Sequence, residues 1–317
     1  MKYRAMGRCG LKLSALSLGG WTTFGESIKD VDTVGAIIRA AYERGVNFFD
    51  MADAYAGGEA ERVMGQALRE FPRHTLVLSS KVFRPMSDDV NDRGLSRKHI
   101  MEAVDRSLRR IGTDYLDLYF CHRDDPETPL EESVRAMDDL VRAGKVLYWG
   151  TSEWPPAKIE EALDIAGRAL YRPQVEQSLC NLLARTRVER DLASLLQQRG
   201  LGVVVWGPLA FGLLTGKYDD GLPEGTRLAR VAALREAWYR KDYVDRVRRL
   251  RPFAERLGVT RAQLALAWLL DRPHVSSVIT GAVSVEQLES NLGAVDLVLS
   301  GEIRDAIDAI FPLEISA

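Results

Sequence analysis

Cysteine is scarce in this chain of 317 residues. Cys9, Cys121 and Cys180 form an odd set of three, and no CxxC pair occurs. This pattern argues against a disulfide framework and against a cysteine zinc site, so we expect no metal centre. A few unpaired cysteines are typical of a reducing compartment, and we therefore expect a cytoplasmic protein.

Long apolar runs and an excess of one charge are also missing. The longest uncharged stretch, Leu201–Gly216, contains five glycines or prolines and is shorter than a bilayer-spanning helix. The first residues, "MKYRAMGRCGLKLS", contain no apolar segment of the kind that a signal peptide needs. The formal net charge of -2 provides no basic field for nucleic acid. We expect neither membrane insertion nor a nucleic-acid partner.

The sequence does contain a regular alternation of short apolar runs and longer helical patterns. Near-continuous runs such as "TLVLSS" and "GVVVWG" are typical of parallel strands that are buried on both faces. Strands are expected at Ala15–Leu18, Val46–Asp50, Thr75–Lys81, Tyr115–His122, Val146–Gly150, Gln174–Gln177, Gly202–Trp206 and Ser277–Gly281. Helices are expected at Asp32–Arg44, Arg97–Ile111, Leu130–Ala143, Arg187–Arg199, Arg261–Leu270 and Ser284–Leu292, with Ser96 as a candidate N-cap.

These strand–helix units predict an α/β fold with parallel strands joined by right-handed crossovers. In a chain of this length, eight units match a closed (β/α)8 TIM barrel. An open doubly wound sheet is the alternative, although GxGxxG, its usual dinucleotide fingerprint, is absent. Two short β-like runs around Gly7–Gly10 predict an N-terminal β-hairpin. We expect Gly216–Tyr243 to form a long insertion before the eighth strand, and residues 1–317 to form a single domain.

Polar and ionisable residues stand where the expected strands end. In chain order they are Asp50 with Tyr55 in the loop behind it ("NFFDMADAYAGG"), Lys81, His122, the pair Thr151–Ser152, and Gln177. Each one alone has an ordinary interpretation as a turn former, a loop anchor, a solvated charge or a hydrogen-bonded core residue. The carboxyl ends of barrel strands meet at one mouth, so their joint occurrence favours a shared site.

Four of these residues form a chemically coherent set. A tyrosine hydroxyl is a poor acid near neutrality, and a nearby ammonium lowers its pKa. Asp50 could orient Lys81, Lys81 could polarise Tyr55, and Tyr55 could then donate a proton. His122 could donate a hydrogen bond to the same carbonyl oxygen. Such a set would stabilise the alkoxide that forms when hydride adds to a carbonyl, and the hydride must come from a cofactor.

At this point the chain resembles the aldo-keto reductase superfamily. "FFDMADAY" is similar to the motif that holds the catalytic Asp and Tyr of that family, while "SSK" and "CH" match its Lys and His positions. The segments "LYWGTSEW" and "WGPLAFGLLTGKY" resemble the branch that contains potassium-channel β-subunits and related bacterial reductases. "TGAVSVEQLESN" completes the pattern, and the resemblance extends over nearly the whole chain.

The resemblance implies an NADPH-dependent oxidoreductase that reduces an aldehyde or ketone, a small-molecule carbonyl substrate, to an alcohol. Tyr55 would be the proton donor, with Asp50, Lys81 and His122 around it. The implied cofactor site consists of Trp21, Asp50, Ser152, Gln177, Trp206, Gly207, Pro208, Leu209, Phe211, Lys217, Gly281, Val283, Gln287 and Asn291.

Within this implied site each group has a place. Ser152 and Gln177 would hold the nicotinamide carboxamide, and Trp206 would stack on the ring. Gly207–Phe211 would pass beneath the pyrophosphate with Lys217 nearby. Gly281, Gln287 and Asn291 would line the adenosine end, and Trp21 and Trp154 would either wall the substrate site or pack in the core or rim.

Two residues depart from the family pattern. Val283 stands where many relatives carry a basic or hydroxylated residue near the expected 2′-phosphate, and Ser290 stands where channel-type relatives often have Glu. Loss of a cation or donor weakens phosphate discrimination, so NADH stays open beside NADPH. His122 follows the enzymatic pattern, whereas some channel β-subunits lack a histidine there.

Two other functions remain open at this stage. One is a cofactor-sensing regulatory subunit that binds NADP(H) and docks to a channel or another partner. The other is a non-enzymatic barrel in which the strand-end residues coincide by chance. The family also includes homo-oligomers, so self-association is a further possibility.

Overall fold

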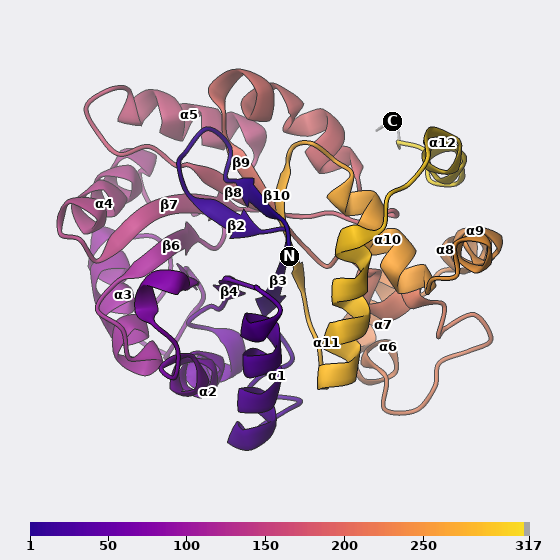
Figure 1. Cartoon of the computed structure of the whole chain (residues 1–317). Coiled ribbons are helices and arrows are strands. Elements are labelled where there is room, and N and C mark those ends of the chain that lie inside the picture. Colours follow the sequence, from indigo (N-terminus) through magenta and orange to yellow (C-terminus); the bar gives the residue numbers. More distant parts are fainter. Residues whose placement is uncertain (314–317) are drawn as a thin grey trace.

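A computed structural model describes residues 1–313 of the chain, and its centre is a closed barrel of parallel strands (Figure 1). The barrel runs in chain order through β3 to β10, and β10 then pairs with β3. The strands are β3 (Leu16–Gly19), β4 (Phe48–Asp50), β5 (Val77–Val82), β6 (Leu116–Cys121), β7 (Val146–Ser152), β8 (Val175–Leu179), β9 (Gly202–Trp206) and β10 (Val275–Thr280). The expected (β/α)8 barrel is confirmed, and each expected strand is present within a few residues of its expected bounds.

Closure of the barrel is decided by β10. This strand pairs in parallel with β3, where Val278 lies opposite Leu16, and also with β9, where Val275 lies opposite Val203. A doubly wound sheet would leave two open edges, so the alternative of an open sheet is wrong. All carboxyl ends of the strands therefore meet at one mouth.

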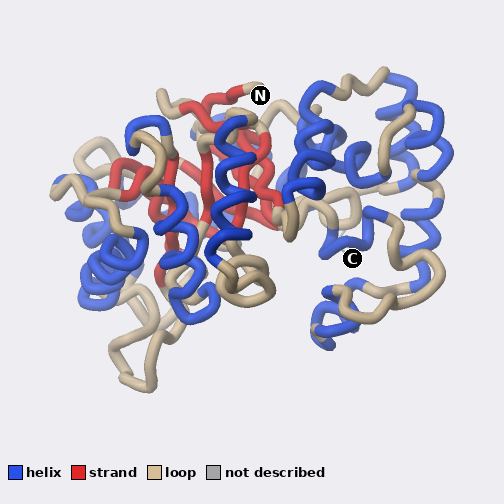
Figure 2. The backbone as a smooth tube through the Cα atoms, turned by 60° about the horizontal axis from the view of Figure 1, so that its bottom comes forward, coloured by secondary structure: helices blue, strands red, loops and turns tan. Residues whose placement is uncertain are grey.

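Helices cover the outside of the barrel, which Figure 2 shows as a ring and a side cluster of helices around the central strands. They are α1 (Val31–Glu43), α2 (Glu59–Leu68), α3 (Arg97–Ile111), α4 (Leu130–Arg142), α5 (Pro156–Ala166), α6 (Arg227–Arg230), α7 (Ala232–Trp238), α8 (Lys241–Arg248), α9 (Arg251–Leu257), α10 (Arg261–Leu270), α11 (Val285–Leu292) and α12 (Gly301–Ile310). Ser96 caps α3 as expected, since its side chain accepts from the backbone N–H of His99. Across residues 1–313, no helix is both long and apolar enough to cross a bilayer.

Two expectations about the connecting segments need correction. Arg187–Arg199 is not one α-helix but two wide π-type turns, Arg187–Asp191 and Leu195–Arg199. The Arg187 guanidinium donates to the carbonyl of Trp154 and to the carboxylate of Glu176. In this wider turn Val188, the next residue, is buried. The insertion Gly216–Tyr243 is not a plain loop, because it contains α6, α7 and the start of α8.

The N-terminal hairpin closes the end of the barrel opposite the mouth. Strands β1 (Tyr3–Ala5) and β2 (Lys12–Ser14) pair antiparallel, as expected, and Met6 and Leu13 are buried in the cluster that fills the barrel interior. Gly7 has a φ of +56°, and a Cβ there would lie 2.5 Å from the carbonyl oxygen of Gly200, so only glycine fits. Gly200 precedes β9, so the hairpin covers the amino ends of the strands and leaves the carboxyl ends open. The single-domain assignment of residues 1–317 stays a prediction.

The helix layer yields a stability test at two glycines. Gly65 of α2 packs on the backbone of Ile111 at the end of α3, and a Cβ there would lie well inside van der Waals contact. Gly35 of α1 has nothing within 4 Å of the corresponding position. We expect Gly65→Ala to lower the free energy of unfolding by about 1–3 kcal/mol through overpacking. Gly35→Ala, the matched control, should raise it by up to about 1 kcal/mol through helix propensity. Urea unfolding of both variants measures this, and effects of the same sign would contradict the packing.

Candidate active site

Asp50 and Lys81 form a buried ion pair at the mouth of the barrel. Asp50 ends β4 and Lys81 lies near the end of β5, and the Nζ of Lys81 is 2.7 Å from the Oδ2 of Asp50. The same Nζ donates to the carbonyl of Met51 at 2.7 Å. Burial alone would lower the pKa of Lys81, but Asp50 and Tyr55 together raise it, so the ammonium stays charged. The other oxygen of Asp50 accepts from the Oγ of Ser79 at 2.7 Å and the Nε2 of Gln177 at 2.9 Å.

Tyr55 lies directly over this ammonium. It begins a 3-10 turn, Tyr55–Gly58, in which Ala56, Gly57 and Gly58 all adopt positive φ values, and this left-handed run turns the chain over the mouth. The Nζ of Lys81 is 4.7 Å from the centroid of the tyrosine ring. Burial raises the pKa of Tyr55, Lys81 lowers it, and the net direction is upward. Lys81 thus acts on this pKa in the expected direction, but desolvation of the phenolate outweighs the ammonium.

His122 completes the group from the end of β6. Its ring centroid is 5.8 Å from that of Tyr55, with the two planes at 75°. The imidazole is buried, and its Nδ1 finds no hydrogen-bond partner within residues 1–313. Burial, helped by the charges of Lys81, Arg123 and Arg84, holds the pKa of His122 well below its usual range. A neutral imidazole with a free ring nitrogen can donate one hydrogen bond to a substrate oxygen.

A second buried carboxyl, which the sequence analysis missed, lies two residues before Tyr55. Neither carboxyl oxygen of Asp53 has a hydrogen-bond partner among the residues that the structure describes. Its backbone N–H lies 3.4 Å from the carbonyl oxygen of Lys81, so it packs against the strand that carries the ammonium. Burial and the nearby Glu61 raise the pKa of Asp53 to about 8. The carboxyl is therefore mainly neutral at neutral pH.

A pocket of about 500 Å³ extends from Tyr55 across the mouth toward α11. Most of the residues expected to bind a cofactor line it: Trp21, Asp50, Trp206, Gly207, Pro208, Leu209, Phe211, Lys217, Gly281, Val283 and Gln287. Ser152, Gln177 and Asn291 do not line it. Ser152 accepts from Arg123 at 3.4 Å, and Asn291 approaches the carbonyl of Gly281 at 3.5 Å. The structure thus brings together two strand ends, the Gly207–Phe211 turn and the segment after β10.

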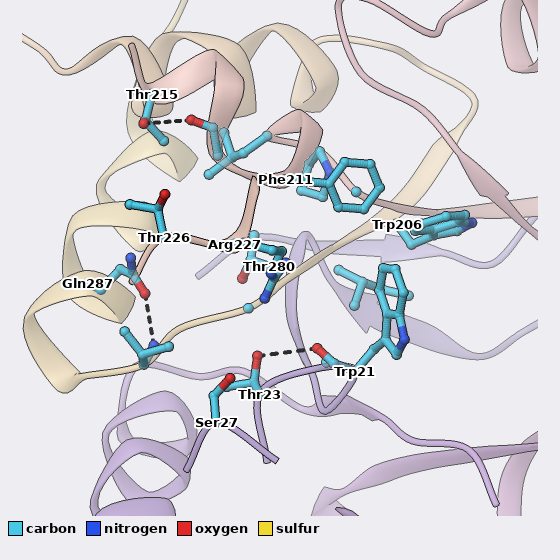
Figure 3. A pocket seen from close by; sticks show the side chains of 18 of the residues that line it. Trp21, Thr23, Ser27, Trp206, Phe211, Thr215, Thr226, Arg227, Thr280 and Gln287 are labelled. Atoms are coloured by element: carbon cyan, nitrogen blue, oxygen red, sulfur yellow. Dashed lines mark hydrogen bonds between the residues drawn. The ribbon is translucent and has the colours of Figure 1, made fainter. Parts of the chain in front are cut away.

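One end of the pocket is aromatic, as Figure 3 shows for Trp21, Trp206 and Phe211. The ring centroids of Trp21 and Trp206 are 5.5 Å apart at 89°, and Phe211 lies 6.0 Å from Trp21. The indole N–H of Trp206 donates to Glu153 at 2.8 Å, which fixes the ring. Trp154 is buried in the core and is not among the residues that line this pocket.

The other end of the pocket is polar and cationic. Thr215, Thr226 and Gln287 point into it in Figure 3, and Lys217, Arg227 and Arg230 also line it. The side chain of Arg227 forms no hydrogen bond or ion pair within residues 1–313, and burial lowers its pKa. The sequence analysis missed Arg227 because it treated Gly216–Tyr243 as an insertion. The sequence pattern that could have indicated it is "EGTR", in which the arginine is the first residue of α6.

The fold and the site define a class of protein. It is a (β/α)8 barrel that gathers a tyrosine, a lysine, an aspartate and a neutral histidine at the carboxyl ends of its strands, beside a pocket with an aromatic and a cationic end.

Comparison with known proteins identifies the family. A model of the aldo/keto reductase family matches residues 15–311, and the chain belongs to this family. A probable voltage-gated potassium channel subunit beta from Arabidopsis thaliana is 44% identical over 318 residues, which cover 98% of this chain and 96% of the relative. The relative of the same description from Oryza sativa subsp. japonica is 45% identical over the same shares. A putative voltage-gated potassium channel subunit beta from Schizosaccharomyces pombe is 44% identical, with 99% of this chain and 95% of the relative covered.

The raised pKa of Asp53 predicts an unusual dependence of stability on pH. In the unfolded chain this carboxyl has a pKa of about 3.9, whereas in the folded chain it lies near 8. Between these values the folded state binds the additional proton, so the Asp53 contribution to stability falls as pH rises, by about 1.4 kcal/mol per pH unit. Asp53→Asn should therefore be less destabilising, or more stabilising, at pH 7.5 than at pH 5. Urea unfolding at both values checks this, and parallel curves for the two proteins would contradict it.

Proposed function

We propose that this chain reduces an aldehyde or ketone to an alcohol, with hydride from NADPH and a proton from Tyr55. One observation carries the proposal: Tyr55 lines the pocket, and its ring lies 4.7 Å from the ammonium of Lys81 and 5.8 Å from the neutral ring of His122. The raised pKa of Tyr55 keeps the phenol protonated at neutral pH, which is the form that can donate.

The residues present fit a nicotinamide dinucleotide. The flat ring of Trp206 suits stacking on the nicotinamide, and Gly207, with a φ of +62°, brings the backbone of the following turn close to the pocket. Lys217 and Arg227 suit the phosphates, and Arg227 has no anionic contact of its own in the part of the chain that the structure describes. When bound, the dinucleotide supplies the hydride. Val283 offers no cation for a 2′-phosphate, so NADH use stays an alternative.

Each side chain then has a part in the reaction. Asp50 accepts two hydrogen bonds besides the ion pair and so fixes Lys81 beneath Tyr55. Tyr55 donates its proton to the carbonyl oxygen as hydride reaches the carbon, and Lys81 stabilises the tyrosinate that remains. His122 donates a hydrogen bond to the same oxygen and sets its direction. Ser152 and Gln177, at the ends of β7 and β8, would orient the carboxamide of the nicotinamide.

Removal of the Tyr55 hydroxyl tests the proton donor. Tyr55→Phe should lower the rate of NADPH oxidation over an aldehyde panel by about a hundredfold or more. NADPH binding, followed by tryptophan fluorescence, should persist because the aromatic and cationic ends are intact. Tyr148→Phe is the matched control, since Tyr148 packs with Cys9 and Leu11 at the hairpin end of the barrel. A Tyr55→Phe variant as fast as the unmodified protein would exclude the mechanism.

Removal of the Arg227 charge tests the cofactor site. Fluorescence titration should show NADPH bound more tightly than NADH, and Arg227→Gln should weaken NADPH binding about tenfold, the loss of one charge-assisted contact. Arg249→Gln is the matched control, because it removes the positive charge of an exposed arginine at the end of α8. Equal affinities for the Arg227→Gln variant and its control would contradict the placement of the phosphates.

A regulatory role is the second candidate, because the relatives covering nearly the whole chain are named as potassium channel subunits. In this case the chain would bind NADP(H) tightly, show no turnover on any carbonyl compound, and co-purify with a channel. Turnover that depends on Tyr55 favours the reductase.

A further inference from the structure

Two arginines follow the ends of β5 and β6, the paired strands that lead to Lys81 and His122 at the mouth. Arg84 follows β5 and Arg123 follows His122 itself at the end of β6. The charges of both lower the pKa of His122, and Arg123 also acts on the phenol of Tyr55. The strands place the two arginines together, because Val82 pairs with Cys121 and the backbone N–H of His122 donates to the carbonyl of Val82 at 2.9 Å. Burial lowers the pKa of Arg123 most, Glu153 raises it, and the charge of Arg84 lowers it.

Neither arginine contacts a carboxylate of the residues that the structure describes. Arg123 donates to the backbone carbonyl of His122 and, at 3.4 Å, to the Oγ of Ser152. The guanidinium carbon of Arg84 lies 5.9 Å from the ring centroid of Phe83, and Arg84 is exposed. No ion pair forms to Arg84 or Arg123 anywhere in residues 1–313.

Glu153 acts on Arg123 but is already committed elsewhere. Its Oε1 accepts from the indole of Trp206 at 2.8 Å and from the backbone N–H of Leu179, and its Oε2 lies 3.5 Å from Arg187. Arg110, by contrast, is paired directly with Glu61 at 2.5 Å. Two neighbouring guanidinium groups with donors to spare therefore mark a place for an anion.

We propose that Arg84 and Arg123 form a subsite for an anionic group, a carboxylate or a phosphate, on the carbonyl substrate. The inference rests on the proposed reductase function and names the substrate class: aldehydes or ketones that carry an anion a few bonds from the carbonyl. The phosphates of the dinucleotide are not the ligand, because Lys217 and Arg227 line the pocket whereas Arg84 and Arg123 do not. A guanidinium fork matches both anions in a bidentate manner.

A pair of substrates that differ only in charge tests the subsite. We expect kcat/KM with NADPH to be at least tenfold higher for succinic semialdehyde than for its uncharged methyl ester. Glycolaldehyde phosphate against glycolaldehyde forms the phosphate arm, and the larger of the two ratios identifies the anion.

Substitution of Arg84 shows whether the arginines carry this selectivity. Arg84 is exposed and its side chain forms no hydrogen bond or ion pair within residues 1–313, so Arg84→Gln loses only the contact with the ring of Phe83. The acid-to-ester ratio should fall about tenfold in Arg84→Gln and fall further in Arg84→Glu, mainly through KM. Arg123→Lys, which keeps the charge, should keep more of the ratio than Arg123→Gln. Arg93→Gln, an exposed arginine of the same loop, should keep the full ratio.

The outcomes separate this inference from the proposed function. Turnover of acid and ester at equal kcat/KM would leave the reductase intact and overturn the subsite, as would a ratio unchanged in Arg84→Gln. Turnover of neither substrate would overturn the reductase. Succinate then tests the subsite directly: fluorescence titration of the NADP+ complex should show binding that weakens at least fivefold in Arg84→Gln, and unchanged or absent binding would overturn it.

Discussion

The buried ion pair of Lys81 with Asp50 is the constraint on which the mouth of the barrel depends. An ammonium with no exposed surface is tolerable only when acceptors surround it, and Lys81 has the carboxylate of Asp50 and the carbonyl of Met51, each at 2.7 Å. Asp50 in turn is held by Ser79 and Gln177. These contacts join β4, β5 and β8, and β8 can reach across only because the sheet is closed. Loss of one partner would leave an uncompensated buried charge, at a cost of about 3–5 kcal/mol.

This pair also sets the protonation states around it. The same burial that raises the pKa of Tyr55 lowers that of His122, so both groups are neutral beside a charged lysine. A neutral phenol and a neutral imidazole can each present an N–H or O–H to one substrate oxygen, while the ammonium stays ready for the charge that develops. The neutral Asp53 adds no negative charge behind Lys81 that would weaken this field.

The sequence predicts those parts of this arrangement that depend on a single local pattern. The apolar runs define the strands, and since the side-chain register of a barrel places strand ends at one mouth, Asp50, Lys81 and His122 follow. Other elements are hidden by signals that point two ways. Helix α2 follows Gly57 and Gly58 and contains Gly65, and three glycines so close together are typical of a loop. Helix α5 begins at Pro156, and proline breaks helices except in their first turn.

The sequence does not predict how the charged side chains are arranged in space around the site. A net charge of -2 suggests a chain without a positive field, yet within residues 1–313 two sets of cations form no ion pair: Lys217 and Arg227 in the pocket, and Arg84 and Arg123 at the ends of β5 and β6. Arg84 and Arg227 are far apart in the sequence, and neither belongs to a basic run, so no local sequence pattern predicts that they lie near the site. Many of the acidic side chains form ion pairs at the surface, such as Glu70 with Arg39. The mouth of the barrel can therefore hold unpaired cations in a protein of net negative charge, because the field that a ligand meets depends on which charges near it stay unpaired and not on the sum of all charges.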